Sequence, residues 1–178
     1  MRKTITRLLL LFLLGATFMT TNVRAQFVTV LPNDNSTSGN GRAPSVRYSH
    51  IRAVYLITPA EMAASGFAPA TQVGGIGWTY QAAGAAGTAG LNVYLENTAD
   101  VTNLKSTTWA TTISTMTLAH SGSTTLGATT TPNVTFSGGS PFTYTGGGVY
   151  VAYDWNCFGG PCKQLLQYAI QQDWLVQQ

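Results

Sequence analysis

The sequence has few charged residues, and this scarcity limits the functions open to it. Aspartate, glutamate, lysine and arginine make up 8% of its 178 residues, against a usual share of about 25%. The polar surface must therefore consist mainly of threonine, serine, asparagine, glutamine and glycine. Such a surface is typical of exported β-proteins and unlike that of a cytosolic enzyme.

A basic surface is also missing once the N-terminal segment is set aside. The full chain carries nine Lys and Arg and six Asp and Glu, a net charge of +3. Four of the basic residues lie within residues 1–25, which contain no acid, so the remaining chain has a net charge of −1. This balance excludes an extended basic face for nucleic acid or anionic lipid.

The only long apolar run lies at the N-terminus. Arg2, Lys3 and Arg7 precede the apolar segment Leu8–Leu14, and the small residue Ala25 follows at a suitable distance. This order predicts a secretory signal peptide over residues 1–25, cleaved between Ala25 and Gln26. Polar residues interrupt the run before it reaches the roughly 20 residues that a membrane span needs. We therefore expect a secreted or cell-surface protein with no membrane span after cleavage.

The sequence lacks the motifs that carry catalysis. His50 and His120 are the only histidines, and neither accompanies a G-x-S-x-G motif. The triple glycine before Val149 lacks the lysine and the helix of a phosphate-binding loop. Glycoside hydrolysis needs two carboxylates, and Glu96 and Asp154 are a conceivable pair, but no motif supports it. The sequence predicts no enzyme, no cofactor and no metal site.

Two cysteines, Cys157 and Cys162, enclose the short segment FGGP near the end of the chain. An even, local pair in an exported protein predicts a disulfide, and the glycines and proline would let the chain turn back to close it. A metal or redox pair is the alternative. The spacing is not C-x-x-C and no further ligands accompany it, which favours the structural bridge.

Short β-prone runs separated by glycine-rich turns make up most of residues 26–162. Leu91, Val93 and Leu95 alternate with polar residues, as in a half-buried strand. We expect one all-β domain here, a β-sandwich of jelly-roll or Greek-key type. The capping box of Thr58 and Glu61 predicts one short helix over residues 60–64. Residues 82–90 are expected to form a loop, and residues 109–118 to be β-prone.

Aromatic residues are the remaining candidates for a binding site. Trp78 and Tyr153 share strand parity with apolar neighbours, so we expect both in the core. Tyr94, Tyr150 and Trp109 fall on the polar parity or near loops. Exposed aromatic side chains of this kind can stack on sugar rings, so these three are the candidate ligand-binding residues. Packing within the core is the alternative.

Residues 163–178 change character abruptly, from Thr- and Gly-rich to Gln- and Leu-rich. A short amphipathic helix would explain this composition. A frameshifted end of the chain would explain it as well. If the tail stands in place of a final core strand, the sheet is left with an unpaired edge.

Several segments together resemble a module of exported Bacteroidetes surface proteins associated with type IX secretion. The segments are RAP from Arg42, RYSHIRAVYLITPAEM from Arg47, IGWTY from Ile76, LNVYLENTAD from Leu91, STTWATTISTMTL from Ser106 and PFTYTGGGVYVAYDW from Pro141. The resemblance implies an N-terminal β-sandwich module, which in such proteins is often followed by fibronectin type III-like repeats and a C-terminal sorting domain. Because neither occurs in this sequence, the resemblance implies that the module is truncated here. It transfers no catalytic residue.

These observations predict a non-catalytic extracellular or cell-surface module with an adhesive, accessory or structural role. Its partner would be an extracellular glycan or a surface protein. A carbohydrate-binding module is the alternative, and a secreted hydrolase is a further one that the lack of an acid–base set disfavours.

Overall fold

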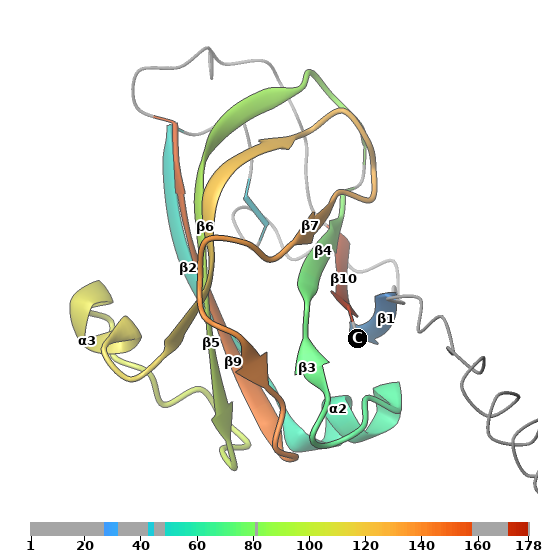
Figure 1. Cartoon of the computed structure of the whole chain (residues 1–178), viewed down its shortest axis with the longest axis vertical. Coiled ribbons are helices and arrows are strands. Elements are labelled where there is room, and N and C mark those ends of the chain that lie inside the picture. Colours follow the sequence, from blue (N-terminus) through green and yellow to red (C-terminus); the bar gives the residue numbers. More distant parts are fainter. Residues whose placement is uncertain (1–26, 32–42, 45–48, 81, 158–170, 178) are drawn as a thin grey trace, which may run out of the picture.

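The computed structural model describes residues 27–31, 43–44, 49–80, 82–157 and 171–177 (Figure 1). The predicted cleavage site between Ala25 and Gln26 lies outside the described residues, and so does Cys162. The signal peptide and the Cys157–Cys162 bridge therefore stay predictions. Cys157 itself directly follows the strand Gly148–Asn156 and is 5% exposed.

Most of the described chain is β-strand, which confirms the all-β prediction. One antiparallel sheet has the strand order β1-β10-β4-β7, a second has the order β2-β9-β5-β6, and β3 pairs with β8. The jelly-roll or Greek-key type stays a prediction. The bounds are β1 Phe27–Leu31, β2 His50–Ile57, β3 Gln72–Val73, β4 Gly75–Thr79, β5 Gly87–Thr98, β6 Thr117–Leu126, β7 Asn133–Thr135, β8 Phe142–Thr143, β9 Gly148–Asn156 and β10 Gln171–Gln177.

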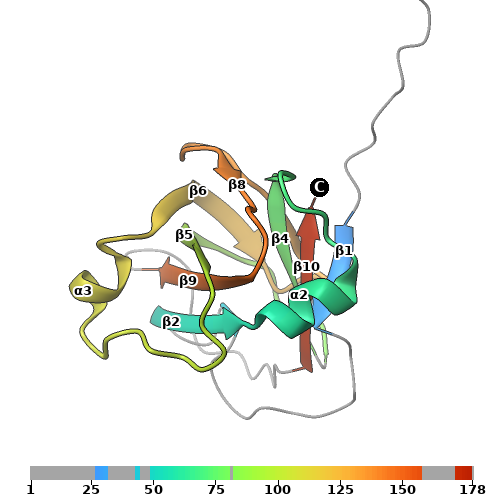
Figure 2. The ribbon, with the colours of Figure 1, turned by 90° about the horizontal axis from the view of Figure 1, so that it is seen from below.

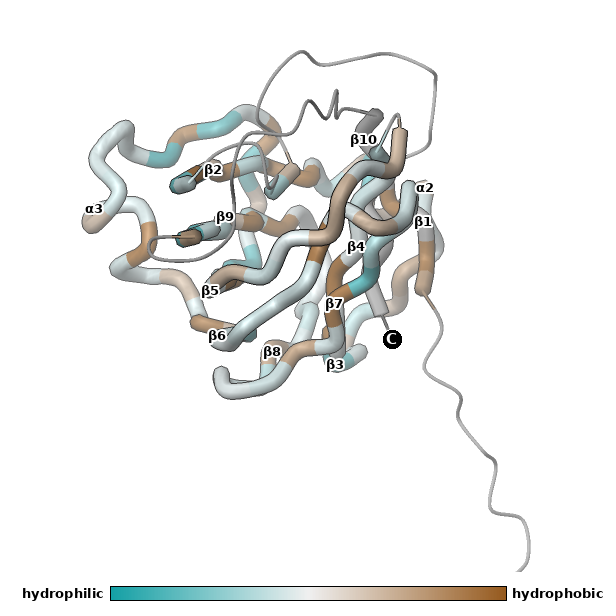
Figure 3. Tube along the Cα trace, turned by 90° about the horizontal axis from the view of Figure 1, so that it is seen from above, coloured by the Kyte–Doolittle hydropathy of each residue, from teal (hydrophilic) through white to brown (hydrophobic). Residues whose placement is uncertain are grey.

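The two four-stranded sheets lie on either side of one apolar core (Figure 2). Trp78 of β4 meets Tyr153 of β9 edge to face, with ring centroids 5.9 Å apart, which confirms that both residues are in the core. Leu91, Val93 and Leu95 alternate into the same core from β5. Figure 3 shows hydrophobic stretches recurring along β1, β7 and β9. Burial of these alternating side chains holds the sheets together.

The predicted short helix is confirmed as α2, Pro59–Ser65, which closes one end of the core. The Thr58 side chain accepts a hydrogen bond from the Glu61 backbone N–H, and the Glu61 carboxylate accepts one from the Thr58 N–H at 2.7 Å. This reciprocal pair satisfies two amides that would otherwise lack a partner. Gly66 ends the helix in the left-handed conformation, and Met62 packs into the core.

Three local expectations are wrong. Residues 109–113 form a second helix, α3 (Trp109–Ile113), where a β-prone run was expected. Strand β5 begins at Gly87, inside the expected loop, because β6 pairs with it from Leu126 onward. Of the two explanations considered for the tail, the helix is wrong for residues 171–177, which form β10 between β1 and β4. In the last two cases neighbouring strands supply backbone partners that local composition does not reveal.

Candidate binding surface

The three aromatic residues predicted to bind ligand lie together on one face of a sheet. Tyr94 comes from β5, Tyr150 from β9, and Trp109 is the first residue of α3. All three belong to a second apolar cluster, separate from the main core. This cluster lies on the outer face of the β2-β9-β5-β6 sheet, and Figure 1 shows α3 on that side of the sheet, away from β4.

Tyr150 has a structural role in this cluster. It is 1% exposed, so its ring offers no surface on which a ligand could stack. Its hydroxyl donates to Asp100 Oδ2 at 2.8 Å and accepts from the backbone N–H of Leu104 at 2.9 Å. Burial raises the pKa of Tyr150, so the hydroxyl keeps the proton that it shares with Asp100. Tyr150 therefore fastens the loop after β5 to the sheet.

An ion pair fastens the same loop nearer to α3. Lys105 Nζ lies 2.7 Å from Glu96 Oε2, and the two side chains are 12% and 24% exposed. Thr115 donates its hydroxyl to the same carboxylate oxygen at 2.5 Å. Lys105 Nζ also lies 5.1 Å from the centroid of the Tyr150 ring. Residues 99–116 are thus a fixed cover over the apolar half of the outer face.

Tyr94 and Trp109 stand at the border of this cover and remain half-buried. Their rings meet edge to face with centroids 6.0 Å apart. The Arg52 guanidinium carbon lies 5.2 Å from the centroid of the Trp109 ring, a cation–π arrangement. Burial raises the pKa of Tyr94, and the nearby Asp154 carboxylate raises it further. The two aromatic rings therefore border a polar area that begins with Arg52 and Asp154.

Asp154 organises the polar half of the outer face. Its Oδ1 lies 2.9 Å from His50 Nε2, and its Oδ2 accepts from Arg52 Nε at 3.0 Å. The Asp154 side chain is 14% exposed, against 32% for His50 and 44% for Arg52. The more buried carboxylate thus holds two outward-facing groups in fixed positions. Because only Nε of Arg52 faces Asp154, its guanidinium can present further N–H groups outward.

Strand register extends this area across the whole sheet. Arg52 stands opposite Asp154, Asp154 opposite Asn92, and Asn92 opposite Ser121. The next outward row contains His50, Asn156, Gly90 and Ser123. We call these eight residues, together with Tyr94 and Trp109, the polar outer face. At about 4.8 Å between strands and 3.4 Å per residue, it measures about 14 Å in each direction.

Sequence reasoning missed Arg52 and Asn92 as members of a site. The sequence did contain a signal for the shared face, because Asn92 has the same strand parity as Tyr94, and Asp154 has the same parity as Tyr150. The missing information was the register that brings β2 beside β9 and β9 beside β5. Residues about 100 and 60 positions apart in the chain meet here, and no local pattern encodes that pairing.

The four acids whose side chains the structure describes all have partners. Glu61 caps α2, Asp100 accepts from Tyr150, and Glu96 and Asp154 face the cations described above. Asp154 stands opposite Asn92, four residues along β5 from Glu96. That separation is about 13 Å, whereas glycosidase carboxylates lie about 5–9.5 Å apart. Glu96 and Asp154 therefore do not form such a pair.

His120 is buried and holds a turn in place. Its Nδ1 accepts from the Ser137 backbone N–H at 3.1 Å, and its Nε2 lies 3.2 Å from Thr124 Oγ1. An accepting Nδ1 requires the neutral ring, with the proton on Nε2. Burial lowers the pKa of His120 below its ordinary value of 6.5, in agreement with that assignment. Both ring nitrogens are engaged within the fold, so the contacts of His120 are those of a structural residue.

This neutral histidine predicts a pH-dependent stability. Because its folded pKa is lowered, the unfolded chain takes up a proton at higher pH than the folded chain. The contribution is complete above about pH 6.5 and is lost as the pH falls towards the folded pKa. Urea midpoints measured between pH 7.5 and 5 should fall less in His120→Gln, which keeps an acceptor and a donor, than in the wild type. Equal pH dependence in both proteins would contradict the assignment.

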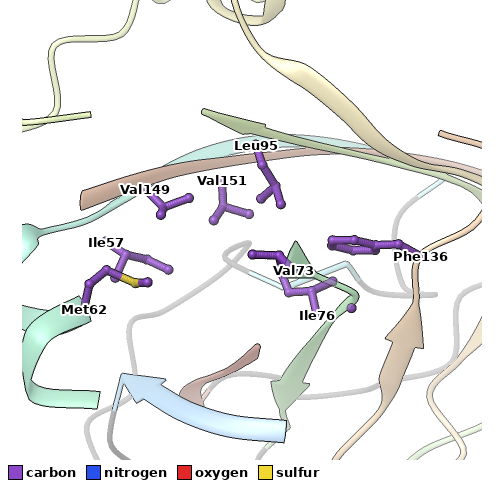
Figure 4. A pocket seen from close by; sticks show the side chains of 9 residues that line it. Ile57, Met62, Val73, Ile76, Leu95, Phe136, Val149 and Val151 are labelled. Carbon is purple, nitrogen blue, oxygen red and sulfur yellow. The ribbon is translucent and has the colours of Figure 1, made fainter. Parts of the chain in front are cut away.

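Two hollows elsewhere in the described chain are poorer candidates for a binding site than this surface. An apolar cavity of about 20 Å³ lies between the sheets, lined by residues that include Ile57, Val73 and Leu95 (Figure 4). It has room for about one water molecule and no polar group to bind it. A shallow hollow of about 180 Å³ beside Phe136 has no charged side chain in its lining.

Neither a metal centre nor a spanning helix is found in the described part of the chain. None of its His, Cys, Asp and Glu residues form a group of three or more that could hold a metal ion. None of its helices is long and apolar enough to cross a membrane. Comparisons with protein-family models, curated proteins and solved structures found no match to this chain. The proposed function therefore rests on the geometry of the polar outer face.

Proposed function

We propose that this protein is an exported, non-catalytic binding module whose contact surface is the polar outer face. The observation that carries the proposal is the fixed arrangement of Arg52 between Asp154 and Trp109. Arg52 is 44% exposed, yet it is held on one side by a carboxylate at 3.0 Å and on the other by an aromatic ring. Rigid, outward-facing aromatic and arginine side chains are the groups that contribute most to binding surfaces.

A contact role accounts for the described ionisable residues better than a catalytic role does. Catalytic acids and bases need a free proton-transfer position and a cleft that shields it. Here the carboxylates are engaged in a helix cap, ion pairs and the hydrogen bond from Tyr150, and His120 is buried with both nitrogens bonded. The signal peptide predicted over residues 1–25 supports a secreted or cell-surface location, where adhesion or an accessory role fits such a surface.

Carbohydrate binding is the second candidate, and one observation favours it. Half-buried Tyr94 and Trp109 border a set of hydrogen-bonding side chains on the same face of the sheet. Sugars combine apolar ring faces with many hydroxyls, so they need both kinds of group close together. A protein partner could bind the same surface. Whether the protein adheres to a polysaccharide or to a protein distinguishes the two candidates.

Beads coated with the purified protein test the proposed contact surface directly. Adhesion is measured on films of neutral polysaccharide, acidic polysaccharide and extracellular matrix protein, for wild type and for Arg52→Glu. We expect at least one film to retain the wild-type beads, and the substitution to weaken adhesion about tenfold or more. The control is Asn133→Asp, which adds the same kind of charge at an exposed site on β7, in the other sheet.

The same films report on catalysis. We expect the protein to release no soluble sugar or peptide from any of them. Adhesion that Arg52→Glu leaves unchanged on every film would overturn the proposed surface. Release of product that increases with protein concentration would overturn the non-catalytic role.

A further inference from the structure

Gly90 is a glycine that the fold does not require. It lies inside β5, the longest strand, with neighbours paired on both sides, and it is exposed on the polar outer face. A Cβ atom placed there would meet only the Asn156 backbone oxygen, at 3.5 Å, an ordinary contact, and its φ lies outside the left-handed region. Glycine inside a strand costs about 0.5–1 kcal/mol relative to alanine.

Gly139 and Gly148 contrast with this position. A Cβ at Gly139 would lie 2.5 Å from the Leu118 oxygen, and one at Gly148 would lie 2.7 Å from the Ile57 oxygen. Those positions exclude any side chain because backbone approaches them closely. Glycine inside a strand also occurs where a ligand must come close to the sheet. No described residue comes close enough to Gly90 to exclude a side chain, and Gly90 is exposed on the face that carries the candidate site, so we consider a ligand as the reason for its missing side chain.

The surroundings of Gly90 indicate what such a ligand would be. Gly90 stands between Asn156 and Ser123, so it leaves a dip with polar side chains on two sides. Asn92 and then Tyr94 follow on the same face of β5. The dip therefore leads past hydrogen-bonding side chains to the aromatic border, within about 14 Å along the strand. This succession of a gap, hydrogen-bonding side chains and aromatic rings along β5 matches a polysaccharide, in which linked rings carry hydroxyls at their edges.

The charges of this surface disfavour an acidic ligand. Arg52 and Lys105 are the only Lys and Arg among the described residues, and each is paired with a carboxylate. The Arg52–Asp154 pair supplies both donors and acceptors while its charges cancel. Sulfate- or carboxylate-rich polymers are bound through excess positive charge, which the described surface does not offer. A neutral ligand rich in hydroxyls fits it.

We propose that a neutral polysaccharide lies across the polar outer face, with its backbone seated over Gly90. Asn92, Asp154 and the outward N–H groups of Arg52 bind its hydroxyls, and one sugar ring packs against the border formed by Tyr94 and Trp109. Binding is non-covalent, and no bond of the polymer is made or broken. This inference rests on the proposed function, because it uses the same contact surface.

Gly90→Val separates binding from folding. Valine fills the dip and favours strand structure, so the melting temperature should be equal or higher. Affinity electrophoresis of the purified protein is run in gels that contain soluble glucan, mannan, xylan or galactan, and in gels with alginate or polygalacturonate. We expect at least one neutral polymer, and neither acidic one, to retard the wild type. Gly90→Val should weaken that retardation about tenfold or more, which equals about 1.4 kcal/mol.

Thr135→Val is the matched control, because it adds valine to an exposed strand position in the other sheet. It should retain wild-type binding. The inference is overturned if no neutral polymer retards the protein, or if Gly90→Val binds like the wild type. Adhesion that depends on Arg52 but occurs only on protein or acidic films would also overturn it, while leaving the proposed contact surface standing.

Discussion

Removal of residues 171–178 is expected to abolish cooperative unfolding of the protein. Strand β10 lies between β1 and β4, so its loss separates β1 from the sheet and exposes one edge of β4. Val176, for example, pairs with Val28 on one side and with Ile76 on the other, and Leu175 and Gln177 are likewise paired on both sides. Losing the backbone hydrogen bonds of an interior strand costs on the order of 5 kcal/mol, a large part of the total stability of a typical domain.

A pair of point variants tests the same strand without shortening the chain. Val176→Pro removes a backbone N–H and fixes φ, which an interior strand does not tolerate. Val176→Thr keeps a β-branched residue at the same position and should retain cooperative unfolding. Urea unfolding followed by tryptophan fluorescence and by circular dichroism compares the variants. A truncated chain and a Val176→Pro variant that both unfold like the wild type would show that β10 does not hold the sheet together.

The tail shows why composition misled the sequence argument. Its glutamines and leucine favour a helix, and that preference is why a helix was one of the two explanations considered. Residues 171–177 nevertheless become a strand, because β1 and β4 both present backbone partners to them. Strand formation in such a position depends on the neighbours more than on intrinsic preference. A chain segment cannot reveal, by its own residues, that two strands lie on either side of it.

The candidate site could also be predicted only in part, because local patterns do not reveal which distant segments pack together. Alternation along β5 and β9 placed Tyr94 and Tyr150 on one outer face, and the structure brings them together. It did not reveal that residues 99–116 cover one half of that face and bury Tyr150. Helix α3, in a threonine-rich run, forms where its apolar residues Trp109 and Ile113 pack onto the sheet. Packing between distant segments decided which aromatic residues stay exposed.

Gly138→Ala is expected to destabilise the protein by about 3 kcal/mol or more, through a close approach of two backbone segments. Gly138 has φ +68°, and a Cβ atom there would overlap the Ser121 carbonyl oxygen. The turn around it is bonded to the edge of β6, with Ser137 accepting from the Ser121 N–H at 2.9 Å. The substitution combines left-handed strain of about 1–2 kcal/mol with a clash that backbone movement must relieve.

Two further glycines separate these causes in one set of measurements. Gly66 has φ +72°, and a Cβ atom there would meet no other atom within 4 Å, so Gly66→Ala should cost only the left-handed strain, about 1 kcal/mol. Gly90→Ala meets neither obstacle and should be neutral or slightly stabilising. Urea unfolding should therefore rank the losses Gly138, then Gly66, then Gly90. Equal losses of unfolding free energy at Gly138 and Gly66 would show that the contact with Ser121 does not constrain the fold. A large loss at Gly90 would show that this glycine has a structural role, and it would remove the reason for placing a ligand above it.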